Sequence, residues 1–210
     1  MNPLHWNRSA VALLIGAPLA WAALLLFHPL GSGQVYDVLR DQVTRWQVVH
    51  VGTLFFIGLM GLAVFVLVRN LPGRAARLSR LAAGTFVVFY GAWEAVAGLA
   101  VGALAQHTNG LPADERAVGS DAIQSLYESP IVGDFGVLNV LGSLGWITAV
   151  LAAAVAVRQA GARRWAVALL AISALAVQHP PPVGPIALAC FAGAVGLIYR
   201  SSPLAAELTP

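Results

Sequence analysis

Between Leu81 and Ala105 the chain carries a single charged side chain, that of Glu94, inside an otherwise uncharged and largely apolar run. A run of this length is enough to cross the hydrocarbon core of a bilayer as a helix. A carboxylate inside that core is costly even on the gentler insertion scales, so it should face protein or water rather than lipid. The run therefore predicts a transmembrane helix whose one charged side chain points into a bundle of helices.

Glycines recur on the same side of this helix as the carboxylate. Gly84, Gly91 and Gly98 follow one another at intervals of seven residues, and Gly98 and Gly102 form a GxxxG pair. At about 100° per residue, Gly91 and Gly98 lie within roughly 60° of Glu94. Small residues let transmembrane helices approach closely, so the charged side should also be the packed side. Such faces could also support a homo-oligomer.

The composition extends this reading to the whole chain. Hydrophobic residues make up 59% of the sequence and charged residues only 10%, with a mean hydropathy of +0.77. A soluble domain would carry about a quarter charged residues. We therefore expect an all-α polytopic bundle of six transmembrane helices forming one domain over 1–210. The expected helices cover residues 10–27, 46–68, 81–105, 131–157, 165–178 and 183–199, with a short surface helix at 112–127 and a frayed tail at 201–210.

The arginines indicate an orientation. All twelve basic residues are arginines, and they lie at the ends of the expected helices rather than in one patch, so nucleic-acid binding is not indicated. With both termini cytoplasmic, nine arginines lie inside and three lie outside, namely Arg40, Arg45 and Arg116. This asymmetry follows the positive-inside rule. We expect a multi-pass protein of a cell membrane, most simply the bacterial inner membrane.

This orientation brings four of the five histidines to the outer ends of the expected helices: His28, His50, His107 and His179. His50 lies about one turn inside its helix, and Glu94 lies roughly 10 Å below the outer boundary. One layer in the outer half of the bundle could therefore gather His50, Glu94, Asn139 and His179. A histidine at a helix end could equally sit among lipid headgroups with no further role.

One class of function that fits this layer is the binding or conversion of a lipophilic small molecule of the lipid, isoprenoid or quinone type. A buried carboxylate suits acid–base work, so Glu94 and its proton partner His50 are the candidate catalytic residues. A Glu94 that is hydrogen-bonded to Tyr90 and has no chemical role is the structural alternative. The sequence does not decide whether the chain is an enzyme. The candidate ligand-binding residues are Tyr90, Trp93, Asn139, Trp146 and His179.

A second class of function is a transition-metal or b-haem site, because neutral imidazoles are common ligands of both. Its ligands would be two or more of the outer-end histidines, which are His28, His50, His107 and His179. Glu94 would be a further ligand or would lie beside them. The sequence has no HxxxH, HExxH or Cys/His run, so this prediction rests on position alone, and no cofactor is required by the sequence. A proton-coupled carrier is a third class, which the lack of an inverted repeat disfavours.

The turn from His179 to Pro182 joins the last two expected helices. Residues 165–178 give about 21 Å of helix, against a hydrocarbon core of about 30 Å. We expect this turn to lie below the outer surface and to bring His179 toward His50 and Glu94. An exposed turn in a locally thinned bilayer is the alternative.

Overall fold

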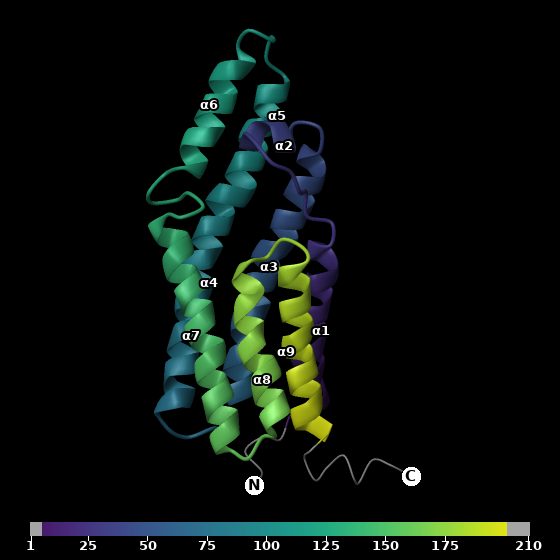
Figure 1. Cartoon of the computed structure of the whole chain (residues 1–210), viewed down its shortest axis with the longest axis vertical. Coiled ribbons are helices and arrows are strands. Elements are labelled where there is room, and N and C mark those ends of the chain that lie inside the picture. Colours follow the sequence, from purple (N-terminus) through teal and green to yellow (C-terminus); the bar gives the residue numbers. More distant parts are fainter. Residues whose placement is uncertain (1–5, 201–210) are drawn as a thin grey trace.

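The computed structural model describes residues 6–200 of the chain (Figure 1). Every regular element in this range is helical: nine α-helices, one π-helix and one 3-10 helix. The elements in chain order are α1 (Arg8–Leu25), α2 (Val35–Leu39), α3 (Val43–Val68), α4 (Arg74–Trp93), the π-helix η1 (Glu94–Ala100), α5 (Val101–Asn109), α6 (Arg116–Tyr127), α7 (Val137–Gln159), α8 (Arg164–Ile172), the 3-10 helix η2 (Ser173–Val177) and α9 (Val183–Arg200).

Five helical stretches in the described part are long and apolar enough to cross a membrane, which confirms the expected class of an all-α multi-pass membrane protein. They are α1, α3, the continuous run of α4, η1 and α5, then α7 and α9. The sixth expected helix is α8 followed by η2, over Arg164–Val177, which is apolar but shorter than the other five. The count of six crossings and the cytoplasmic position of both termini remain predictions.

The long helices form a closed ring. α1 packs on α3, α3 on α4, α4 on α7, α7 on α8, α8 on α9, and α9 returns to α1. Figure 1 shows that α1 begins and α9 ends at the same end of the bundle. An even number of crossings has this arrangement.

The connection before α7 is a turn rather than the first part of a helix. α7 begins at Val137, six residues later than the expected start at 131. The backbone N–H groups of Gly133 and Asp134 donate to the carbonyls of Ser129 and Tyr127, both at 2.9 Å. A Cβ at position 133 would lie 2.3 Å from the Tyr127 carbonyl oxygen, so this turn requires glycine. Asp134 therefore belongs to the turn.

At the opposite end from the start of α1, the helices α2, α5 and α6 project beyond the bundle and form a small cap (Figure 1). The cap has its own apolar cluster, in which Tyr36, Leu39 and Ile123 are buried. The Tyr36 hydroxyl donates to Asn109 Oδ1 at 2.7 Å, which ties α2 to α5. α6 corresponds to the expected surface helix, and it packs on α5 and α2.

Glycines of α7 place this helix directly against the backbone of α4. A Cβ at Gly142 would lie 2.5 Å from the Tyr90 backbone nitrogen, and one at Gly145 would lie 2.6 Å from that of Phe86. Small residues at such contacts let two helix backbones approach closely. This contact fixes the height of Tyr90, whose side chain reaches the candidate site.

Candidate metal centre

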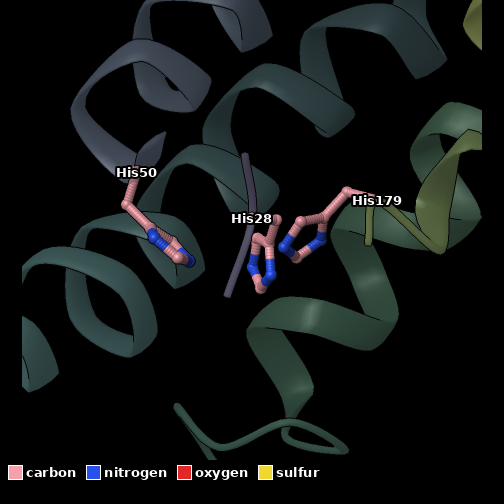
Figure 2. A group of neighbouring side chains, drawn as sticks. All are labelled: His28, His50 and His179. Carbon is pink, nitrogen blue, oxygen red and sulfur yellow. The ribbon is translucent and has the colours of Figure 1, made fainter. Parts of the chain in front are cut away.

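Three buried histidines lie close together inside the bundle (Figure 2). His28 follows α1, His50 lies in α3, and His179 lies in the turn between η2 and α9; their exposed fractions are 7%, 3% and 7%. One potential ligand atom from each lies within 4.8 Å of the other two. The His28 ring centroid is 5.1 Å from that of His50 and 5.0 Å from that of His179. The fold thus brings three separate segments to one point.

Two of these imidazoles use Nδ1 for a hydrogen bond to the backbone. His28 Nδ1 lies 2.7 Å from the Pro29 carbonyl oxygen, and His50 Nδ1 lies 2.8 Å from that of Trp46. Because a carbonyl oxygen can only accept, Nδ1 carries the proton and donates in both cases. In a neutral imidazole the lone pair is then on Nε2, the atom left to bind a ligand.

The same conclusion holds for His179 through Tyr90. The Tyr90 hydroxyl oxygen lies 3.1 Å from the Val177 carbonyl oxygen and 3.1 Å from His179 Nδ1. The hydroxyl proton goes to the carbonyl, so His179 Nδ1–H donates to the hydroxyl oxygen. His179 Nε2 is buried and has no hydrogen-bond partner among residues 6–200. All three histidines therefore present the same free nitrogen.

Burial favours the neutral form of the two histidines that lie in turns. Desolvation lowers the pKa of His28, and the positive charge of Arg45 acts in the same direction against the hydrogen bond to Pro29. Desolvation, followed by the charges of His28 and His50, lowers the pKa of His179 well below 6.5. Neutral imidazole is the form that binds transition metals.

Glu94 is the fourth polar group of the cluster. Its side chain is fully buried, and its Oε1 lies 3.9 Å from His50 Nε2. Neither carboxylate oxygen has a hydrogen-bond partner within the described chain. The alternative hydrogen bond to Tyr90 is not formed, because that hydroxyl is engaged by Val177 and His179. A buried carboxyl group without hydrogen bonds is costly unless a charge or a metal compensates it.

The helix changes its winding at this carboxylate. Glu94 is the first residue of the π-helix η1, a rare geometry that occurs mostly as short insertions and often at functional sites. Trp46 Nε1 donates to the Gly98 carbonyl oxygen of η1 at 2.7 Å, and the Trp46 ring stacks on His50 with the centroids 3.9 Å apart. Trp46 thus holds the π-helix and the histidine in register.

The predicted glycine side of the helix packs on α3 most closely at Gly98 and Gly102, and a Cβ at Gly91 would make ordinary contacts of 3.8–3.9 Å with α3. A Cβ at Gly98 would lie 2.5 Å from His50 Cδ2, and one at Gly102 would lie 2.9 Å from Trp46 Cδ1. A Cβ at Gly84 would have no atom within 4 Å. Of the glycines on this side, the two with the closest approach to α3 therefore lie next to the cluster.

The structure does not bring every predicted site residue into the cluster. His107 is exposed on α5, because the helix continues past 105 as far as Asn109 and carries this residue into the cap. Trp146 packs beneath the site, where its Nε1 donates to the Ser173 carbonyl oxygen at 2.9 Å. Trp93 is buried with its ring centroid 5.8 Å from that of His179, and its Nε1 has no hydrogen-bond partner in residues 6–200.

A cavity of about 670 Å³ adjoins the cluster. Its walls include His28, His179, Trp93 and the predicted ligand-binding residue Asn139, together with Asp134 from the turn before α7. Desolvation raises the pKa of the half-buried Asp134 above its ordinary value. The cavity gives the histidines a neighbouring space far larger than an ion or a single water molecule needs.

Trp46 is not among the candidate site residues predicted from the sequence, although it holds His50 and η1 together. The available signal was the spacing in WQVVH: positions i and i+4 share a helix face, which puts the Trp46 carbonyl within reach of His50. The π-helix has no comparable signal in the sequence.

Comparison with known proteins gives no match: no family model matches the chain, and neither does any curated protein or solved structure. The function is therefore argued from the chemistry of the site.

Proposed function

We propose that this chain is an integral membrane metalloprotein that holds one divalent transition-metal ion on the Nε2 atoms of His28, His50 and His179. The observation that carries the proposal is that the three buried imidazoles each bring one ring nitrogen within 4.8 Å of the other two, while their hydrogen bonds occupy Nδ1 and leave Nε2 able to bind. Metal-binding histidines are typically held in this way, because the second-nitrogen hydrogen bond fixes both tautomer and ring orientation.

The donor set favours Zn²⁺ as the occupant. Three neutral imidazoles suit zinc, copper, iron and nickel, and three histidines with an open fourth position are a common arrangement of catalytic zinc. Zn–N bonds of about 2.0–2.1 Å in a tetrahedron place the nitrogens about 3.3 Å apart. The potential ligand atoms here lie within 4.8 Å, so ion binding would draw the rings together by up to about 1.5 Å.

Glu94 would supply negative charge beside the ion. Its Oε1 is 3.9 Å from His50 Nε2, which places the carboxylate at the edge of the same ligand group. In a low-dielectric interior a carboxylate without hydrogen bonds and a divalent ion each offset the cost of burying the other. The unpartnered oxygens of Glu94 are thereby accounted for.

A single ion fits the ring spacing better than haem b does. A haem would need a flat slot between two imidazoles that approach from opposite sides. Here the rings of His28, His50 and His179 lie 5.0–6.1 Å apart and are tilted or edge-on to one another. The neighbouring Trp46 ring stacks directly on His50. The three imidazoles thus surround a point rather than flank a plane.

Acid–base conversion of a lipophilic molecule by Glu94 and His50, without a metal, is the second candidate function. The 3.9 Å approach of these two side chains and the adjoining cavity favour it. It differs from the first proposal in one measurable respect: the purified protein would hold no stoichiometric metal.

Elemental analysis of the detergent-purified protein after incubation with Zn²⁺ and dialysis tests the proposal. We expect about one zinc per chain in the wild type and less than about a tenth of that in His28→Ala and His179→Ala, since one of three ligands is lost. His107→Ala is the matched control, because this exposed histidine lies outside the cluster, and it should retain full occupancy. A wild type without metal, or equal loss in His107→Ala, would contradict a site on these three residues.

A further inference from the structure

The cavity beside the cluster has two chemically different ends. At its inner end lie His28 and His179, two of the three proposed metal ligands. Its outer rim includes Phe135, Val140 and Leu144, with exposed fractions of 91%, 45% and 53%. A molecule that filled the cavity would therefore have a polar end near the ion and an apolar end at the rim.

The apolar rim continues along the outside of α7. Val140, Leu144, Leu151 and Val155 are all exposed, and their spacing of four, seven and four residues places them on one helix face. α7 is one of the helices long and apolar enough to span a membrane, so this face meets lipid tails. The opening of the cavity is thus continuous with the lipid-facing surface.

Polar groups line the space between the two ends. Asn139 Nδ2 donates to the Asp134 carbonyl oxygen, and Ser143 Oγ donates to Asn139 Oδ1 at 2.8 Å. These bonds hold Asn139 and Ser143 in place and leave the second amide N–H of Asn139 for a ligand. The volume of about 670 Å³ lies within the range usual for small-molecule sites, about 300–1,000 Å³.

We propose that this cavity binds a membrane amphiphile with a hydrocarbon tail and an oxygen-bearing head group, taken up from the bilayer along α7 so that the head oxygen reaches the metal. This inference rests on the proposed function, because the head group would bind to the ion that His28, His50 and His179 hold. It assigns a ligand class and an entry route, and it places Ser143 and Leu144 beside the tail of the ligand.

The test uses the Co²⁺-loaded protein and alkyl hydroxamates, whose two head oxygens bind divalent metals. Acetohydroxamate, hexanohydroxamate and decanohydroxamate are titrated while the visible Co²⁺ spectrum is followed, and the free concentration is corrected for partition into micelles. Each buried methylene contributes about 0.8 kcal/mol, which corresponds to about a fourfold gain in affinity. We expect a total gain of at least about 100-fold from the shortest to the longest probe.

Two variants of α7 locate the tail. Ser143→Phe fills the cavity and should weaken decanohydroxamate binding at least about tenfold, with acetohydroxamate binding little changed. Leu151→Phe, on the exposed side of α7 about two turns away, is the matched control and should bind both probes as the wild type does. The same Co²⁺ content in all three proteins shows that the site is intact.

The two proposals fail in different ways. A wild type that takes up no Co²⁺ overturns both. A wild type that holds Co²⁺ and binds the hydroxamates with no gain in affinity along the chain series overturns the cavity proposal and leaves the metal site standing. Equal decanohydroxamate binding by Ser143→Phe and Leu151→Phe does the same. The chain series needs no variant, so a misfolded Ser143→Phe would not remove the test.

Discussion

The hydroxyl oxygen of Tyr90 lies 3.1 Å from Nδ1 of His179, although the two residues are 89 positions apart in the chain. The contact joins α4 to the turn between η2 and α9, and it fixes which nitrogen of His179 carries the proton. Tyr90 is therefore a positioning residue for a proposed metal ligand.

Tyr90→Phe should weaken zinc binding about 10- to 100-fold, the usual effect of losing a group that orients a metal ligand. A competition titration against a zinc indicator measures this. Tyr36→Phe is the matched control, because it also removes a hydroxyl hydrogen bond but does so in the cap. Equal affinities for the two variants would show that the hydroxyl does not orient His179.

Gly98→Ala should disturb the site without a polar change. The added Cβ would lie 2.5 Å from His50 Cδ2 and 3.0 Å from Glu94 Oε1, so His50 must move. We expect zinc affinity to fall at least about tenfold. Gly84→Ala, in the same long helix but with no atom within 4 Å of the new Cβ, should keep its affinity and gain up to about 1 kcal/mol of helix stability. Parallel zinc titrations and thermal melts of the two variants separate these effects.

Glu94→Gln should move stability and metal affinity in opposite directions. The amide has nearly the shape of the carboxyl group but cannot carry its charge, so the metal-free protein no longer has to bury a potential anion. We expect the melting temperature of the metal-free protein to stay level or rise, while zinc binding weakens. If zinc affinity stayed at the wild-type value, the carboxylate would not contribute to the site.

Acidification should destabilise the metal-free protein below pH 6.5. Burial lowers the pKa of His28 and, further, that of His179. As pH falls below 6.5, the unfolded chain, whose histidines have ordinary pKa values, binds more protons than the folded chain. The free energy of unfolding therefore has its full value above pH 6.5 and declines as pH falls toward the lower pKa values of the folded protein. Melting temperatures of metal-free protein between pH 8 and pH 5 measure this. A His28→Ala variant should show a shallower decline.

Reporter fusions test the orientation. The α3–α4 and α7–α8 connections lie at the end of the bundle where α1 begins, and the cap containing α6 lies at the other end (Figure 1). Fusions after Arg74 and Arg163 should report the cytoplasm, and a fusion at Gly119 should report the outside, because arginine-rich connections stay in the cytoplasm. The reverse pattern would place the histidine cluster in the inner half of the membrane.

The class of fold could be read from the sequence, because long apolar runs with few charges have few solutions other than membrane helices. The start of α7 could not. Residues 131–136 are mostly apolar and continue the hydropathy of the helix, whereas Gly133 and Gly136 and their backbone hydrogen bonds form a turn there. Hydropathy indicates that a segment is removed from water, but it does not distinguish a helix from an apolar turn.

The depth of the candidate site in the membrane could be predicted from the sequence, but the identity of the residues that form it could not. Helix ends on one side of a membrane share a level, so the arginine pattern alone put His28, His50 and His179 in one layer. Their meeting depends on α9 packing beside α1, which no local pattern encodes. His107 was included because it also lies at the outer end of a predicted helix. In the structure it lies in the cap, because its helix continues to Asn109.

The proposed ligands are contributed by positions 28, 50 and 179, and the last of these lies in the final hairpin of the bundle. During synthesis the first two histidines are added to the chain long before the third. The full ligand set therefore exists only once α8 and α9 have folded and closed the ring against α1. On the proposed function, capture of the ion would therefore follow the closure of the ring. A truncated or misinserted chain would lack the ion, and metal content would report directly on correct assembly in the membrane.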